Sequence, residues 1–171
     1  MESSNVKLYS LSLRDVRTYA FAALFIVGNI VFPQLCHALM PKGGLIFLPI
    51  YFFTLIGAYK YGAKVGLLTA LLSPIINSAF FGMPPVSALP MIVMKGVLLA
   101  CAASVIANRT KSVSILALLA VVLLYQVVGC GIEWAVKGSF MAGVQDFRLG
   151  VPGMLIQVIG GWAFIKFILK K

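Results

Sequence analysis

Six apolar segments fill almost the whole sequence, and polar residues gather in the short stretches between them. Each segment holds roughly 16 to 25 residues, enough to cross a hydrocarbon core of about 30 Å as a helix. Within the segments, apolar residues follow one another instead of alternating with polar ones, which favours helices over the strands of a transmembrane barrel. The sequence therefore predicts six membrane-spanning helices, at about residues 16–39, 44–59, 62–81, 87–107, 113–136 and 151–169.

The composition supports a membrane location. Of the 171 residues, 61% are hydrophobic and only 11% are charged, and the mean hydropathy is +1.04. A water-soluble domain of this size needs a polar outer layer, and these charged residues are too few to supply one. With the bilayer as solvent, each span must satisfy its own backbone hydrogen bonds as a helix. We expect one all-α integral membrane domain over residues 1–171, in which residues 1–15 form a cytoplasmic leader.

The basic residues are divided unequally between the two sets of loops. If the N-terminus is cytoplasmic, ten of the fourteen lie inside, three lie outside and one, Lys95, lies within a span. Cytoplasmic loops are enriched in Lys and Arg, so both termini are expected in the cytoplasm, with the protein in the plasma (inner) membrane. The net charge of +10 then reflects topology, and no nucleic-acid partner is expected. The outer residues are Lys42, Lys137 and Arg148, and the inner ones are Lys7, Arg14, Arg17, Lys60, Lys64, Arg109, Lys111, Lys166, Lys170 and Lys171.

Polar side chains inside the spans gather toward the outer face. Lys95 lies roughly 9 Å deep at 1.5 Å per residue, and Glu133 lies at a similar depth on the next helix. His37, Asn77 and Gln157 come from three further spans. Because charged residues within a membrane usually line a cavity or form ion pairs, this convergence predicts a substrate-binding pocket that opens outward.

Four of these five residues have a simpler explanation. The Lys95 ammonium could extend to the outer headgroups, and Glu133 could lie at the interface in contact with water. His37 could be an exposed residue at a loop edge, and Asn77 could cap the bent helix end after Pro74.

Two further outer features belong to the expected pocket. Trp134 follows Glu133 and is a candidate substrate contact, although it also fits an interfacial aromatic belt. Met83 lies in the uncharged, proline-stiffened loop 81–85, which we interpret as a lid; the alternative is a tight connector.

The cysteines give little indication of chemistry. Cys36, Cys101 and Cys130 lie in apolar stretches without C-x-x-C spacing, which is typical of buried structural thiols. A thiolate at Cys130 could in principle ligate the cobalt of a corrinoid, but we expect no metal and no cofactor. The sequence also lacks the phosphate-binding pattern G-x-x-x-x-G-K-[ST], so any energy input is expected from a gradient or from another polypeptide.

The middle of the chain resembles a known family. Its run FLPIYFFTLIGAYKYGAKVGLLTALLSPIINSAFFGMPP, residues 47–85, contains FLP, a Gly-rich turn, LLSP and GMPP in that order. This run is similar to the second and third spans and the following loop of S-components of energy-coupling factor (ECF) transporters. Those are six-helix subunits that capture vitamins for a membrane coupling subunit and its ATPases.

The resemblance implies both a pocket and a transport cycle. In that family, outer loops and the outer halves of spans four to six form the substrate site, and the protein topples in the membrane to release its cargo. Here this implies a pocket containing His37, Asn77, Met83, Lys95, Glu133 and Gln157.

Three functions remain open at this point. The first is vitamin capture for an ECF module, and the second is a solitary vitamin transporter, for example of cobalamin. The third is an integral-membrane enzyme that uses Glu133, His37 and Lys95. We expect no enzyme, because the sequence has a single histidine and no recognisable catalytic set. The sequence does not specify the vitamin.

Overall fold

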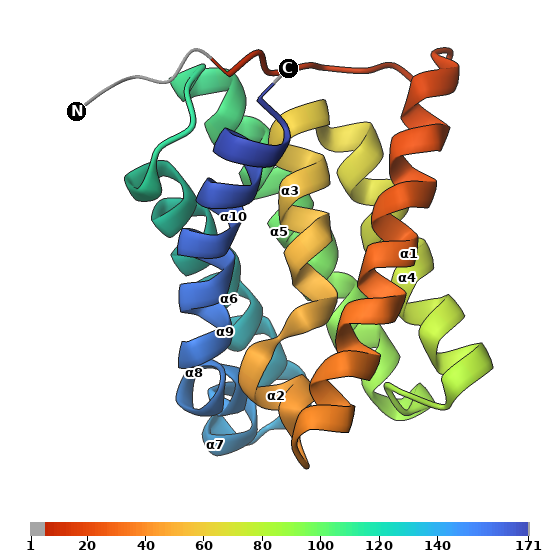
Figure 1. The fold of residues 1–171 in the computed structure, drawn as a ribbon. Coiled ribbons are helices and arrows are strands. Elements are labelled where there is room, and N and C mark those ends of the chain that lie inside the picture. Colours follow the sequence, from red (N-terminus) through yellow and green to blue (C-terminus); the bar gives the residue numbers. More distant parts are fainter. Residues whose placement is uncertain (1–5, 171) are drawn as a thin grey trace.

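The computed structural model describes residues 6–170, which form a bundle of helices that run alternately up and down (Figure 1). No strand occurs within this range. Five helical segments are long and apolar enough to cross a membrane, which indicates a multi-pass membrane protein. They agree within three residues with five of the six expected spans. They are α1 (Val16–Leu39), α4 (Ala63–Phe81), η2 (Val86–Ala88) with α5 (Leu89–Thr110), α6 (Ile115–Lys137), and the segment Val151–Ile168.

The last segment changes helix type along its length. It begins as α9 (Val151–Leu155), with Pro152 in the first turn, where its missing N–H removes no helical bond. Two π-helical stretches follow, η3 (Ile156–Gly160) and η4 (Phe164–Ile168), separated by α10 (Gly161–Ala163).

The second expected span is not a single helix. The structure contains α2 (Gly43–Phe47), the 3₁₀ turn η1 (Pro49–Tyr51) and α3 (Phe52–Tyr61) in its place. The break lies at Leu48, whose φ of 46° is left-handed. Pro49 is the cause, because proline lacks an N–H and disfavours helical backbone at the residue before it. With only 10 residues, α3 is shorter than the roughly 20 residues that a membrane-crossing helix needs.

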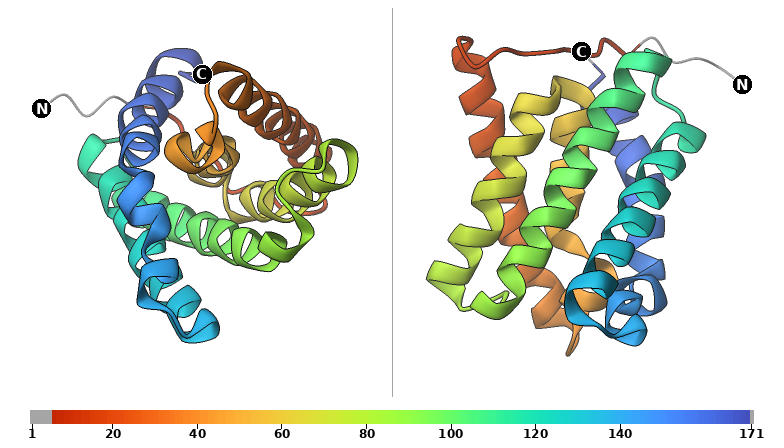
Figure 2. Two further views of the ribbon diagram at one scale, coloured as in Figure 1. Left: turned by 90° about the horizontal axis from the view of Figure 1, so that it is seen from below. Right: turned by 180° about the vertical axis from the view of Figure 1, so that it is seen from behind.

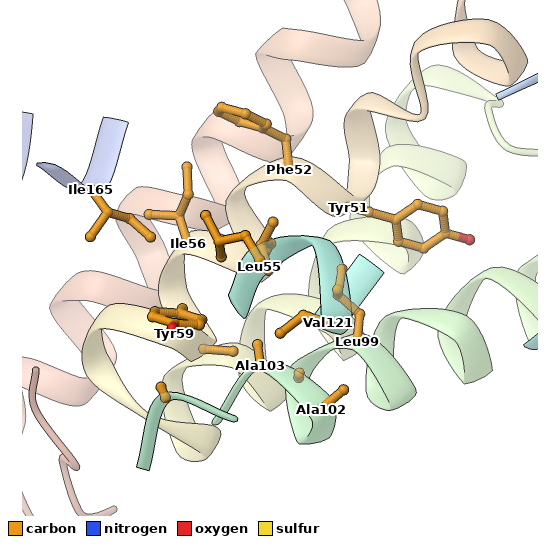
Figure 3. Packing of buried hydrophobic residues seen from close by; sticks show 14 of the residues in the cluster. Tyr51, Phe52, Leu55, Ile56, Tyr59, Leu99, Ala102, Ala103, Val121 and Ile165 are labelled. Carbon is orange, nitrogen blue, oxygen red and sulfur yellow. The ribbon is translucent and has the colours of Figure 1, made fainter. Parts of the chain in front are cut away.

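Helix α3 lies at the centre of the bundle. Seen along the bundle, the other long helices surround it (Figure 2). Leu55, Ile56 and Ala58 are completely buried, as expected for a helix that is apolar on all sides. Leu55 and Ile56 lie in one cluster with Leu99 of α5, Val121 of α6 and Ile165 of η4 (Figure 3).

Small residues bring the helices around α3 into close contact. A Cβ atom at Gly66 of α4 would lie 2.3 Å from the Cβ of Ala58 and 3.1 Å from that of Ala100. Gly96 of α5 is similarly close to Ala70, with 3.2 Å to its Cβ. The small residues thus serve packing within this chain.

The N-terminal leader lies across the end of the bundle where α3 ends (Figure 1). The backbone N–H groups of Tyr9 and Leu11 donate to the carbonyl oxygens of Lys60 (2.8 Å) and Tyr61 (3.1 Å). Asp15 then caps α1 by accepting from the N–H of Arg17 at 2.9 Å. Of the expected leader, residues 1–5 lie outside the described residues, as does Lys171 at the other end of the chain.

At the opposite end, α2 contacts the short helix α8 (Gln145–Leu149), and α7 (Phe140–Gly143) lies at the same end of the bundle (Figure 1). Helices α7 and α8 connect α6 to α9, where the sequence predicted an outer loop. Gly153 of α9 packs directly on the backbone break of the second segment, since a Cβ there would lie 2.4 Å from the carbonyl oxygen of Phe47.

Candidate functional site

A cavity of about 500 Å³ occupies the end of the bundle that carries α2, α7 and α8. Its volume falls within the range of small-molecule binding sites. The rim is exposed at Lys42, Met83 and Gln145, whereas Tyr51, Asn77 and Lys95 at its inner part are at most 3% exposed. Apolar side chains form most of the wall, among them Ile50, Met91 and Ile92. The polar lining consists of Gln34, His37, Lys42, Tyr51, Asn77, Lys95, Glu133, Lys137, Gln145 and Asp146.

The strongest polar interactions of the cavity meet at Lys95. Its ammonium donates to Glu133 Oε2 of α6 at 2.5 Å and to Asp146 Oδ2 of α8 at 2.6 Å. Lys137, one helical turn after Glu133, donates to the other oxygen of that carboxylate at 2.5 Å. Two cations and two anions thus form one connected cluster, in which Lys95 is 1% exposed. Lys95 and Glu133, both expected in the pocket, contact each other directly in the structure.

Gly129 of α6 makes room for the stem of Lys95. A Cβ at this position would lie 2.9 Å from Lys95 Cγ and 3.3 Å from Cε. Because α6 carries no side chain there, the lysine stem passes directly over its backbone and the ammonium reaches Glu133 one turn further along.

Asn77 contributes an unsatisfied acceptor. Its Nδ2 donates to the carbonyl oxygen of Asn29 at 2.8 Å, and its Oδ1 has no partner although the residue is 1% exposed. Asn29 is held in turn by Thr54, and its Oδ1 accepts from the N–H of Phe53 at 3.1 Å. A buried acceptor without a partner is costly to the folded state, and this oxygen is itself closed off from the cavity.

His37 lies on the α1 side of the cavity. Its Nδ1 is 2.9 Å from the carbonyl oxygen of Pro33, an acceptor, so Nδ1 carries the proton and Nε2 is left for other partners. Gly44 of α2 lies against the ring, because a Cβ there would be 2.6 Å from His37 Cε1.

Gln157 lies just below the cavity and outside its lining. The ring of Tyr51, which does line the cavity, packs on Tyr125 with centroids 5.6 Å apart. The hydroxyl of Tyr125 donates to Gln157 Oε1 at 2.9 Å and accepts from Gln126 at 3.2 Å. Gln157 Nε2 has no partner. This polar group therefore supports the wall formed by Tyr51.

Two other residues considered from the sequence lie away from the cavity. Trp134 is 51% exposed and makes an edge contact with Phe140 of α7, with centroids 5.4 Å apart. Cys130 is buried, and its thiol is 3.9 Å from Gln126 Oε1. Neither residue belongs to the lining.

The structure thus brings five of the seven predicted site residues into one cavity: His37, Asn77, Met83, Lys95 and Glu133. The sequence reasoning missed Asp146, the second acidic partner of Lys95. Charge balance is the signal that could have revealed it. The sequence has only four acidic residues, and an outer region with Lys95 and Lys137 needs more than Glu133 alone.

Comparisons of this chain with protein-family models, with curated proteins and with solved structures gave no match. The function must therefore be inferred from the site.

Proposed function

We propose that this protein captures a small vitamin or related metabolite from the outer side of the plasma membrane for uptake. The observation that carries the proposal is the cavity itself. It has an exposed rim, an apolar wall and, at its inner part, a buried set of polar groups that includes Lys95, Glu133 and Asn77. Such a combination of apolar surface with a few fixed polar groups is typical of sites that hold small molecules.

The proposal includes six crossings. The segment of α2, η1 and α3 begins at the cavity end and finishes at the opposite end (Figure 1), so we count it as the sixth crossing. Its broken backbone is acceptable in a membrane because the other helices surround α3 and shield it from lipid (Figure 2).

Charge supports the orientation. The cavity end carries Lys42, Lys137 and Arg148, whereas the other basic residues apart from Lys95 belong to the leader, to the opposite helix ends and to the C-terminus. By the positive-inside rule, the cavity then faces outward and both termini are cytoplasmic.

This topology predicts the results of reporter fusions. Fusions after Lys60, Arg109 and Lys171 should report the cytoplasm, and fusions at Pro85 and Gln145 the outer side, because the basic loops remain inside. An enzymatic reporter pair that is active on opposite sides of the membrane measures this directly. Reversal at any two positions would contradict the model, and absence of the crossing by α2, η1 and α3 would reverse the signals at all five positions.

We propose that the energy for release comes from a separate ATPase module joined through a membrane coupling subunit, as the resemblance to ECF S-components implies. The solitary transporter is the alternative. Two experiments separate these alternatives. Copurification of ATPase subunits in stoichiometric amounts supports the module, and active uptake in a host that lacks such subunits supports solitary transport.

The capture function itself is tested by identifying the cargo. The protein is purified in nanodiscs, denatured, and the released small molecules are identified by mass spectrometry. Vitamins, including pantothenate, pyridoxine, riboflavin, thiamine and cobalamin, are then added back, and the midpoint of thermal unfolding is measured. We expect at least one to raise the midpoint, since a ligand that binds only the folded state stabilises it. If nothing copurifies and no vitamin changes the midpoint, the proposal is wrong.

Gly129→Ala is expected to weaken that binding. The added methyl group must move the stem of Lys95, against which it would lie at 2.9 Å, so the ammonium leaves its position in the cavity. We expect about a tenfold loss of affinity for the identified cargo, equivalent to about 1.4 kcal/mol.

Gly131→Ala is the matched control for this change. It lies on the same helix, and a Cβ there has no atom within 4 Å. Its affinity should equal that of the parent, measured by isothermal titration in the same nanodiscs. Equal affinities of all three proteins would show that the position of Lys95 is unimportant for binding.

A further inference from the structure

Asp146 is attached to the cavity by a single side-chain interaction. It lies on the short helix α8, in the connection between α6 and α9, and its carboxylate bonds to Lys95 at 2.6 Å. This is the only side-chain hydrogen bond of Asp146 within residues 6–170. The side chain is 18% exposed and lines the cavity.

The two carboxylates on Lys95 are held very differently. Glu133 belongs to the long helix α6, and both of its oxygens are engaged, one by Lys95 and one by Lys137. Asp146 belongs to a helix of 5 residues and uses one oxygen only. The carboxylate of Asp146 can therefore leave by giving up one lysine partner, whereas Glu133 would have to give up two.

We propose that Asp146 occupies the position of a substrate carboxylate, and that the cargo is a small carboxylic acid that replaces Asp146 on the Lys95 ammonium. This inference rests on the proposed capture function and specifies its substrate class. Lys95 is then the residue that recognises the acid group, and Asp146 is an internal competitor that fills the position when no ligand is bound.

Charge within the cavity favours an exchange of one carboxylate for another. The lining contains three cations, Lys42, Lys95 and Lys137, and two anions. Departure of Asp146 without replacement would leave Lys95, 1% exposed, with Glu133 as its only anionic partner, and Glu133 is shared with Lys137. An uncompensated buried charge is strongly unfavourable. A ligand with one negative charge gives Lys95 a second anionic partner again, whereas a neutral or cationic ligand does not.

The rest of the ligand is indicated by the other walls. Ile92, Met91 and Pro84 line the cavity and favour a largely apolar body attached to the acid group. The structure thus indicates a carboxylic acid whose remaining part is mainly apolar.

Matched pairs of probes test this inference. The pairs are nicotinate and nicotinamide, pantothenate and panthenol, biotin and biotinamide, and lipoate and lipoamide, in which only the acid group changes. Each is titrated against the parent protein in nanodiscs by thermal unfolding and calorimetry. We expect at least one acid to bind, its neutral partner to bind at least about tenfold more weakly, and Lys95→Met to remove the difference.

Asp146→Asn provides the second readout. Removal of an internal competitor frees the binding position for a larger fraction of the time, so affinity for the acid should rise by about tenfold. Asp146→Glu is the matched control, because it keeps a competing carboxylate and should show no such gain. If Asp146 only anchors α8, both variants lose stability and neither gains affinity. Should Asp146→Asn fail to fold, Asp146→Ser serves the same comparison.

The outcomes separate this inference from the function on which it rests. If a neutral or cationic vitamin binds and no acid does, the acid specificity is wrong while capture stands. The same holds if acid and amide bind equally. If no vitamin of any charge binds and no small molecule copurifies, both proposals fall.

Discussion

Replacement of Lys95 by methionine is expected to cause the largest loss of both stability and binding. The substitution leaves Asp146 without a cation and leaves Glu133 with Lys137 alone, in a part of the bundle where Glu133 is 7% exposed. Removing one partner of a buried ion pair costs about 3–5 kcal/mol, because the remaining charge stays desolvated. The midpoint of thermal unfolding should therefore fall well below that of the parent.

A triple variant separates stability from recognition. Lys95→Met combined with Glu133→Gln and Asp146→Asn removes both carboxylates with the ammonium, so no buried charge of this cluster lacks a partner. We expect most of the stability to return, since neutral replacement of a buried ion pair is often tolerated. Binding of cargo should not return, because losing a buried charge-assisted contact costs about 2–5 kcal/mol of affinity. A triple variant that binds like the parent would show that the cavity recognises its ligand elsewhere.

Gly66→Ala is expected to destabilise the bundle through packing alone. The new Cβ would lie 2.3 Å from the Cβ and 2.8 Å from the Cα of Ala58, so α3 and α4 must move apart. Overpacking of this kind costs about 1–3 kcal/mol, and here the obstructing atoms belong to the central helix and cannot rotate away. The measurement is the free energy of unfolding in mixed detergent micelles.

Gly131→Ala is the matched control for Gly66→Ala. The same methyl group enters another helix at a position with no atom within 4 Å, so only helix propensity changes, and alanine is favoured by about 1 kcal/mol. Gly66→Ala should therefore lower the free energy of unfolding and Gly131→Ala should raise it. Equal free energies for both variants would show that the close contact of α3 with α4 is unimportant for stability.

The sequence alone determined the helical class and most of the helix positions. An apolar run long enough to cross the bilayer must form its backbone hydrogen bonds within itself, which a helix does. Five of the six expected segments agree with the structure. The sequence also indicated four of the ten polar residues that line the cavity, because a polar side chain in an apolar segment needs a polar environment. His37, Asn77, Lys95 and Glu133 were found by this argument alone, and all four line the cavity.

The second segment shows where local sequence information was insufficient. Pro49 was visible within an apolar run, but proline is acceptable near the start of a helix, so a short continuous span was the expected result. The structure places Leu48 in the left-handed region, with Gly153 of α9 packed against the broken backbone. That contact joins residues about a hundred positions apart, so periodicity in either segment could not reveal it.

Tertiary structure also decided which polar residues share the cavity. Gln157 and Glu133 lie at similar depths in the sequence, but only Glu133 faces the cavity, because Tyr51 packs between the cavity and the hydrogen bond of Tyr125 with Gln157. Depth gives the position of a residue along the membrane normal, whereas the direction of its side chain depends on helix rotation and packing. Asp146 is the clearest case. The sequence shows it only as an acidic residue between two apolar segments, and it becomes part of the site because α8 folds against Lys95.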